Sequence, residues 1–191
     1  MLERFERQKN QALANYQASK SVGDVDEEAI PLLDYVNSLK DHYTTSSCSG
    51  RTSLLDDNEV KGDSRFIKQW HVETTAGEVM KAASKPKYIL WFKYEAPILH
   101  IASRDTESAN TFLAACRNSG LKRGGIQSLK PGRVMLEVFG TKKIEAPLMN
   151  KQGMLVDEDY LEILVETSNR YLMEGFKQLR RLTEGLKKSY A

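Results

Sequence analysis

An unbroken apolar seam near the end of the chain constrains the fold more than any other feature. From Asp157 onward, apolar residues recur at intervals of three and four, the spacing of one face of an α-helix. The pattern predicts one amphipathic helix over about residues 157–188, which at 1.5 Å per residue would reach roughly 45 Å. Because that length can exceed the diameter of a small domain, we expect its basic end, with Arg180 and Arg181, to be free to contact a partner. The seam comprises Leu161, Leu164, Val165, Ser168, Leu172, Phe176, Leu179, Leu182 and Leu186.

Helical and strand patterns alternate along the rest of the chain. Thr75 and Glu78 predict a capping box, the Pro131-Gly132 turn predicts a hairpin, and the acidic residues 56–64 predict an exposed loop. Helices interleaved with hairpins indicate the α+β class, with a mixed, largely antiparallel sheet flanked by helices in a single domain, 1–191. Predicted helices lie at 2–19, from a cap at Asp24 or Asp26 through Leu39, at 75–83, at 105–120 and at 157–188; predicted strands lie at 65–72, 88–95, 98–102, 126–129, 133–139 and 144–148.

Composition and charge are those of an ordinary globular protein. The chain has 191 residues, of which 40% are hydrophobic and 28% charged, and this length suits one compact domain. A formal net charge of +2 gives no argument for nucleic-acid binding. Residues 117–143, however, carry seven basic residues and a single acid, Glu137. Local patches of this kind contact phosphates, although a solvated hairpin face explains the same charges.

Cysteine usage and hydropathy set the expected compartment. Cys48 and Cys116 are the only cysteines, and without a C-x-x-C pair they indicate neither a disulfide framework nor a zinc site. The charged start lacks the apolar stretch of a signal peptide, and no window approaches the roughly 18 apolar residues of a spanning helix. We therefore expect a cytoplasmic protein with no membrane association and no bound metal.

The run from Tyr43 to Arg51 predicts a ligand site. It reads Tyr-Thr-Thr-Ser-Ser-Cys-Ser-Gly-Arg, so small hydroxyl and thiol residues precede a glycine and an arginine. Hydroxyls and exposed amides hold anions or polar edges, Gly50 permits positive φ or close backbone approach, and Arg51 supplies a forked, permanent charge. The alternative is a Ser/Thr-rich turn after a strand. For the whole nonamer we favour a ligand-binding loop, because functional residues concentrate on loops held by rigid elements.

Other candidates for chemistry lie on the predicted strands. Lys93 and Glu95 share a strand face with Trp91, either as a surface ion pair or as contacts to a ligand. His71 and His100 are candidates for positioning or proton acceptance, because imidazole is poised near neutral pH. We interpret His42 as structural. One of the two tryptophans, Trp70 or Trp91, can stack on a flat base, and core packing is expected for at least one of them.

Four blocks of this sequence resemble the tRNA wybutosine-synthesising protein 3 family of archaea and eukaryotes. The first reads Thr-Thr-Ser-Ser-Cys-Ser-Gly-Arg, as in the main signature of the family, and the resemblance covers nearly the whole chain. The third departs from the family pattern at Leu121, Lys122 and Gly124. The blocks are Thr44–Arg51, Phe92–His100, Ser119–Ile126 and Ile144–Leu148.

This resemblance implies an S-adenosylmethionine-dependent methyltransferase. Its expected reaction methylates the N4 nitrogen of the tricyclic guanine derivative beside the anticodon of phenylalanine tRNA. Since the chain has no Gly-x-Gly-x-x-Gly between a strand and a helix, the cofactor would bind outside the doubly wound Rossmann frame. The expected roles are catalysis for His100, His71 and Glu95; cofactor binding for Ser46, Ser47, Cys48, Ser49, Gly50, Arg51 and Lys93; and tRNA binding for Lys122, Arg123, Arg133 and Glu145.

Two alternatives remain open at this point. Cys48 with His71 or His100 would suit a nucleophilic hydrolase, although no hydrolase signature accompanies them. A non-catalytic RNA-binding protein would use the basic stretch 117–143 and perform no chemistry.

Overall fold

The computed structural model describes residues 2–57 and 62–190, which divide into two compact units. The first unit contains Met1–Ser49, Pro97–Thr141 and Gly175–Ala191, and the second contains Gly50–Ala96 and Lys142–Glu174. Each unit has its own antiparallel sheet with helices, so the predicted α+β class is confirmed and no doubly wound parallel sheet occurs in the described residues. Among these residues, no helix is both long enough and apolar enough to cross a membrane.

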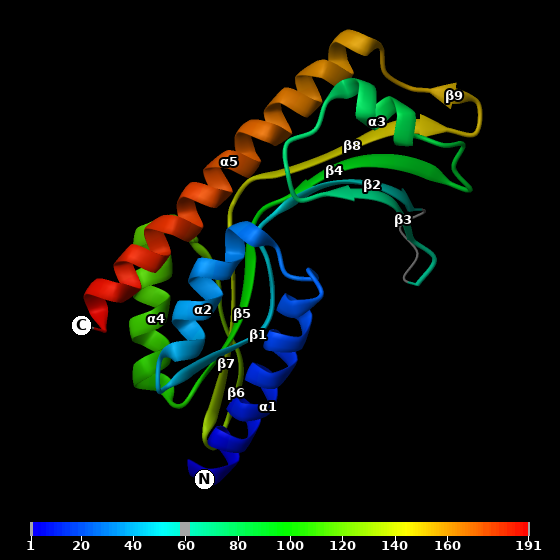
Figure 1. Cartoon of the computed structure of the whole chain (residues 1–191). Coiled ribbons are helices and arrows are strands. Elements are labelled where there is room, and N and C mark those ends of the chain that lie inside the picture. Colours follow the sequence, from blue (N-terminus) through cyan, green and yellow to red (C-terminus); the bar gives the residue numbers. More distant parts are fainter. Residues whose placement is uncertain (1, 58–61, 191) are drawn as a thin grey trace. The chain divides into compact units, whose positions relative to one another are not determined.

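The first unit is a four-stranded sheet with helices on both faces. The strand order is β1-β5-β7-β6, and all pairs are antiparallel. Figure 1 shows α1 on one face, with α2 and α4 on the other. The elements are α1 (Leu2–Ser21), a 3-10 turn (Glu27–Ala29), α2 (Ile30–Ser38), β1 (His42–Cys48), β5 (Ile98–Ser103), α4 (Thr106–Ser119), β6 (Arg123–Lys130), β7 (Arg133–Phe139) and the last turns of α5 (Glu158–Ser189).

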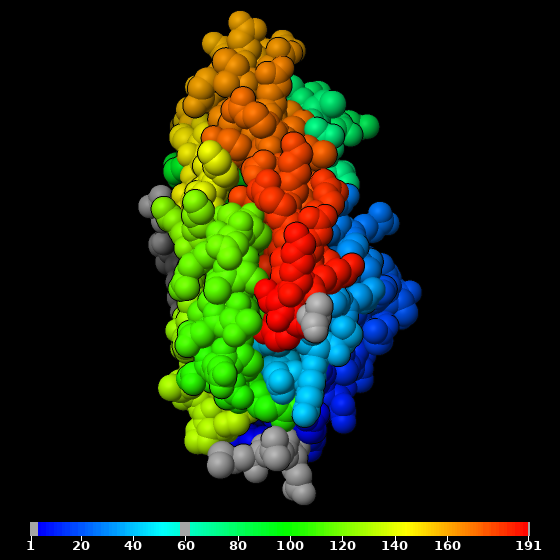
Figure 2. Space-filling model, turned by 90° about the vertical axis from the view of Figure 1, so that its left-hand side faces the viewer, coloured from blue at the N-terminus to red at the C-terminus, as the bar shows by residue number. Residues whose placement is uncertain are grey.

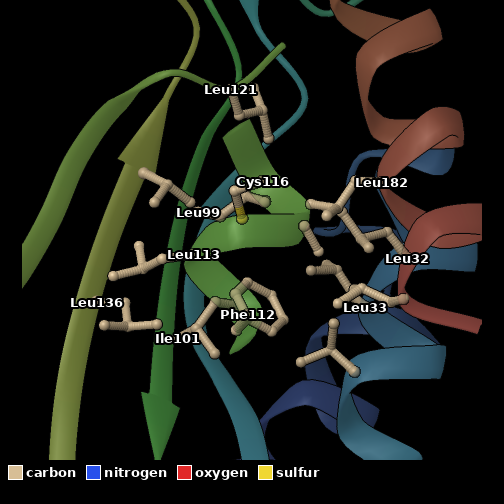
Figure 3. Close-up of a cluster of buried hydrophobic side chains, with 14 of the residues drawn as sticks. Leu32, Leu33, Leu99, Ile101, Phe112, Leu113, Cys116, Leu121, Leu136 and Leu182 are labelled. Carbon is tan, nitrogen blue, oxygen red and sulfur yellow. The ribbon is translucent and has the colours of Figure 1, made fainter. Parts of the chain in front are cut away.

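Side-chain alternation along the strands builds the core of this unit. Leu99 and Ile101 of β5 point toward α4, where they meet Phe112 and Leu182 in one buried cluster (Figure 3). The end of α5 lies between α4 and α2, and Figure 2 shows it in red between green and light blue. By the same alternation, His100 lies on the opposite face of the sheet, toward the side that carries α1.

The second unit is a sheet covered on one face. Its strand order is β3-β2-β4-β8-β9. Leu90 and Phe92 of β4 pack with Val79 and Leu161, which come from α3 and α5, so these helices cover that face. The alternate positions of β4, which include Lys93 and Glu95, face the other way. The elements are β2 (Arg51–Asp57), β3 (Arg65–Trp70), α3 (Ala76–Ala82), β4 (Ile89–Glu95), β8 (Lys143–Asn150), β9 (Gly153–Met154) and the first turns of α5.

Most predicted helices and strands are confirmed, and so are several of the residues predicted to begin or end them. The Thr75–Glu78 capping box is present, and Gly120 ends α4 at φ 102°. Pro147 lies on β8, whose only neighbour opposite β4 among the described residues is the two-residue β9, as expected for proline in a sheet. Trp70 packs in the core of the second unit, whereas Trp91 is half-buried on the other face of β4.

Three local predictions are wrong. The Thr44–Arg51 block is not a loop, because β1 continues to Cys48 and β2 begins at Arg51. The prediction of an exposed loop at 56–64 is wrong for Asp56, which is buried in β2. Residues 58–61 of this predicted loop lie outside the described part of the chain. The carboxylate of Asp26 does not cap a helix but accepts hydrogen bonds from Ser49.

The prediction that the last helix extends beyond the domain is also wrong, although Lys177, Lys187 and Lys188 of its basic end are exposed. Leu182 and Leu186 are completely buried in the core of the first unit. Arg180 pairs with Glu28 at 3.0 Å, and Arg181 donates to the carbonyl of Ser119 at 3.3 Å. The helix end is therefore part of the folded unit, because its apolar seam continues to Leu186.

His42 is buried and hydrogen-bonded, which confirms its structural interpretation. Its Nδ1 lies 2.9 Å from Ser103 Oγ and its Nε2 lies 2.6 Å from the Tyr190 hydroxyl. Burial lowers the pKa of His42 from 6.5 to about 4. The folded protein therefore keeps this ring neutral at pH values where the unfolded chain already binds a proton.

We expect the free energy of unfolding to depend on this histidine below neutral pH. The contribution is fully present above pH 6.5 and is lost as the pH falls toward 4, because only the unfolded chain binds the proton in that window. Between pH 7 and pH 5 the loss should be about 2 kcal/mol. Urea unfolding of the wild type and of His42→Gln measures it. An equal loss in both proteins would contradict the assignment.

Candidate active site

The signature block is held by a strand and a tight connection rather than by a flexible loop. Gly50 has φ 101°, in the left-handed region that favours glycine. The preceding Ser49 is completely buried, and its amide and hydroxyl donate to Asp26 Oδ2 at 2.7 and 3.0 Å. Asp26 therefore fixes the end of β1, and the hydroxyl of Ser49 is already occupied.

A line of polar side chains crosses the first unit on the face opposite its leucine core. Ser46 Oγ lies 3.1 Å from His100 Nδ1, and His100 Nε2 lies 2.9 Å from Glu137 Oε2. The second oxygen of Glu137 accepts from Gln127 Nε2 at 3.1 Å. The side chains of His100 and Glu137 are 31% and 28% exposed, so solvent and ligands reach them. We call this line the Ser46–Gln127 relay.

The contacts of His100 define what each ring nitrogen can do. A carboxylate only accepts, so Nε2 carries the hydrogen that is shared with Glu137. In the neutral ring, Nδ1 is then an acceptor and takes the hydroxyl hydrogen of Ser46. In the protonated ring, Nδ1 donates to the carbonyl oxygen of Ser46, 3.2 Å away. The site therefore has a partner for Nδ1 in both protonation states, and Glu137 stabilises the cation.

A hollow of about 490 Å³ in the first unit is bordered by the same strand. This volume is within the range of small-molecule sites. Amide side chains from α1 (Gln8, Gln11 and Asn15) and the hydroxyls of Thr45, Ser46 and Ser47 form much of its polar lining. Among the described residues, Gln8 Oε1 and Ser47 Oγ are buried without a hydrogen-bond partner. Buried polar atoms of this kind are costly unless a ligand or water completes them.

Arg51 lies in the second unit, where two contacts fix its guanidinium. Its Nε donates to Glu95 Oε2 at 2.7 Å, and its Cζ lies 4.8 Å from the centre of the Phe66 ring. Among the described residues, its two terminal nitrogens have no partner. The arginine is therefore oriented by its neighbours, and its forked end remains available for an anion.

Lys93 and Glu145 pair on the same sheet. Lys93 Nζ lies 3.0 Å from Glu145 Oε1, and Lys143 Nζ lies 2.7 Å from Glu145 Oε2. The hydrogen bond from Lys143 lowers the pKa of Glu145 against the effect of burial, and Lys93 lowers it further. Both oxygens of Glu145 are thus occupied by cations, so it offers little to an RNA base.

The basic residues of the stretch 117–143 lie at both ends of one hairpin and beyond it. Lys122 and Arg123 are exposed at the start of β6, and Arg123 is opposite Phe139. Arg133 is at the other end of the same hairpin, opposite Lys130, and lines the 490 Å³ hollow. The last lysines of the stretch belong to the second unit. His71, the other predicted histidine, follows β3 in the second unit and is half-buried.

Several residues of these arrangements do not stand out in the sequence as site residues. Glu137 and Gln127 complete the relay, Asp26 holds Ser49, and Gln8 lines the hollow. The sequence does contain an indication that Glu137 is special, since Glu137 is the lone acid in a basic stretch. It lies on the same side of its strand as Met135. The sequence context of Asp26 is misleading, because an aspartate before a helix usually caps that helix.

Comparison with known proteins identifies the class. The family described as methyltransferase TYW3 matches residues 7–188. The protein of Archaeoglobus fulgidus named tRNA(Phe) 7-((3-amino-3-carboxypropyl)-4-demethylwyosine(37)-N(4))-methyltransferase is 35% identical over 188 residues, 97% of this chain and 93% of its own length. The protein of the same name from Methanocaldococcus jannaschii is 36% identical over 182 residues, 93% and 94% of the two lengths.

Two solved structures share the fold of this chain. The PH1069 protein from Pyrococcus horikoshii has a TM-score of 0.91 at 30% identity and covers 98% of this chain and 96% of its own. A hypothetical protein from Aeropyrum pernix has a TM-score of 0.76 at 26% identity, over 84% and 96% of the two chains.

The fold and the sequence thus define a methyltransferase that lacks the doubly wound sheet in its described residues. The chain belongs to the methyltransferase TYW3 family, the tRNA wybutosine-synthesising proteins. The predictions of family, fold class and methyl transfer are confirmed, and the hydrolase alternative is set aside.

Proposed function

We propose that this protein methylates the N4 nitrogen of the tricyclic wybutosine precursor in the anticodon loop of phenylalanine tRNA, with S-adenosylmethionine as donor. The observation that carries the proposal is the position of Ser46. It borders the 490 Å³ hollow and also bonds to His100, so a cofactor site and a proton acceptor meet at one side chain. The names of the relatives supply the substrate.

The hollow fits the polar, mostly neutral body of a nucleoside. Gln8, Gln11 and Asn15 supply amide donors and acceptors, which are suited to the edge of a purine. Ser47 Oγ and Gln8 Oε1 would gain the partners that they lack among the described residues. When bound there, S-adenosylmethionine supplies the methyl group as a sulfonium.

The chain's own task is to align the nitrogen and accept its proton. As N4 gains the methyl group, its proton passes to Ser46 Oγ while the hydroxyl hydrogen of Ser46 passes to His100 Nδ1. The resulting imidazolium is stabilised by Glu137, which Gln127 orients. Asp26 and Ser49 act as positioning residues, because they hold the end of β1. In this proposal Glu95 orients Arg51, and His71 takes no part in proton transfer.

Ser47→Ala should have opposite effects on stability and on ligand binding. Removing a buried hydroxyl without a partner should raise the free energy of unfolding of the ligand-free protein by about 1 kcal/mol. Losing the same hydroxyl should weaken binding of S-adenosylhomocysteine about five- to ten-fold, since one hydrogen bond contributes about 1 kcal/mol. Calorimetry and urea unfolding measure the two effects.

Ser119→Ala is the matched control, because the hydroxyl of Ser119 is buried but donates to the Cys116 carbonyl at 2.7 Å. It should leave S-adenosylhomocysteine binding unchanged. Unaltered binding in Ser47→Ala would overturn the cofactor assignment. The reaction itself is tested by transfer of labelled methyl groups to tRNA that carries the unmethylated tricyclic base. Binding of that tRNA without transfer would instead favour the non-catalytic RNA-binding protein.

A further inference from the structure

A second hollow, of about 740 Å³, lies in the second unit and is strongly basic. Arg65 at the start of β3, Lys85 and Lys87 before β4, and Lys151 in the turn between β8 and β9 line it. Among the described residues, two acids share the lining, Asp56 and Asp63. None of these residues belongs to the relay or to the signature block.

Both acids are already occupied. Asp56 is buried in β2, and its oxygens accept the amides of Lys87 and Tyr88 at 2.7 and 2.9 Å. Asp63 accepts from Lys87 Nζ at 3.3 Å and from the Tyr88 hydroxyl. Lys87 is therefore neutralised, and Asp56 fixes the backbone of the segment that carries it.

Three cations of the hollow remain uncompensated. Among the described residues, Arg65, Lys85 and Lys151 form no ion pair, and all three are exposed. A concave surface with three such charges concentrates anions. Arg65 offers a planar fork for phosphate, and the lysines offer point charges.

We propose that this basic hollow binds backbone phosphates of the substrate tRNA away from the base that is modified. The proposal rests on tRNA being the substrate. It commits to RNA, because three cations that are unpaired among the described residues share one concave surface, which suits a run of backbone phosphates, and because the proposed substrate is itself an RNA. The hollow replaces the stretch 117–143 as the main electrostatic contact.

The salt dependence of tRNA binding tests this proposal. Each phosphate contact contributes about 0.7 to 0.9 to the slope of log K against log salt. The double variant Lys85→Ala/Lys151→Ala should lower that slope by about 1.5 and weaken tRNA binding about ten-fold near 0.1 M salt. Its kcat at saturating tRNA should equal that of the wild type, because neither lysine touches the relay.

A matched variant, Lys177→Ala/Lys188→Ala, removes two exposed lysines from the end of α5 and should keep the wild-type slope. An unchanged slope in Lys85→Ala/Lys151→Ala, an equal fall in both double variants, or a wild type that does not bind tRNA overturns the phosphate site. Normal methyl transfer with an unchanged slope refutes this inference alone. A lowered slope without methyl transfer supports the phosphate site and refutes the proposed reaction.

Discussion

Replacing His100 by glutamine should lower kcat about 10³-fold, which is within the range for loss of a general base. Glutamine keeps a similar size and can still donate to Glu137, so the sheet and the hollow should be preserved. The glutamine amide is not basic, so it cannot accept a proton at the position of Nδ1, where the hydroxyl of Ser46 lies 3.1 Å away. Single-turnover methyl transfer measures the chemical step, and calorimetry with S-adenosylhomocysteine should show unchanged affinity.

Two further variants separate proton transfer from mere packing. Ser46→Ala removes the hydroxyl that connects the substrate to His100 and should also reduce kcat strongly. Glu137→Gln keeps the shape of the relay but removes the charge that stabilises the imidazolium. Its kcat in single-turnover methyl transfer should fall about ten- to a hundred-fold. A purely structural role for Glu137 would lower the free energy of unfolding of Glu137→Gln and leave its single-turnover rate unchanged.

The assignment of His100 would be refuted by either of two results. Wild-type kcat in His100→Gln would show that no proton passes through this ring. A large loss of S-adenosylhomocysteine affinity with unchanged single-turnover chemistry would place His100 in the cofactor site instead.

Elements with strong local signals could be predicted from the sequence, and those fixed by tertiary contacts could not. The alternation of residues 88–95 and the capping box at Thr75 depend on near neighbours, so both appear as expected. The segment His42–Cys48 is rich in serine and threonine, yet it forms a strand because β5 supplies its hydrogen-bonding partner. Asp56 is buried because the amides of Lys87 and Tyr88 satisfy its carboxylate, a contact about thirty residues away in sequence.

The same distinction applies to the candidate site. The signature block and His100 stand out in the sequence because their residue types are unusual in a core. Their partners do not stand out, since Glu137 reaches His100 only through the pairing of β5 with β7. Asp26 reaches Ser49 across 23 positions of sequence. A single sequence does not show which residues of two strands lie opposite each other. The relay can therefore be recognised only once the pairing of the strands is known.

Arg51→Ala should reduce kcat/KM about a hundred-fold or more while the protein remains folded. The terminal nitrogens of Arg51 have no partner among the described residues, and Glu95 and Phe66 hold the guanidinium in place. A carboxylate bound by both nitrogens gains two charge-assisted hydrogen bonds, each contributing about 1.5 kcal/mol. Their joint loss of about 3 kcal/mol corresponds to about a hundred-fold.

Two ligands present such a carboxylate, and both carry it on an α-amino acid group. One is the methionine part of the methyl donor, and the other is the 3-amino-3-carboxypropyl arm that appears in the names of the relatives' substrate. A hundred-fold weaker binding of S-adenosylhomocysteine by Arg51→Ala, with the KM for tRNA unchanged, would assign Arg51 to the donor. The reverse pattern would assign it to the arm, and tRNA that lacks the arm should then be methylated equally by both proteins.

Arg51→Lys serves as the control for charge, because lysine keeps the cation but loses the fork and should recover only part of the activity. Phe66→Leu serves as the control for orientation, since it removes the ring that lies 4.8 Å from the guanidinium and leaves the charge intact. The expected loss of kcat/KM in Phe66→Leu is smaller than in Arg51→Ala, and it should come from weaker binding of the same ligand. Wild-type kinetics in Arg51→Ala, with normal affinity for both ligands, would show that this guanidinium only braces Glu95.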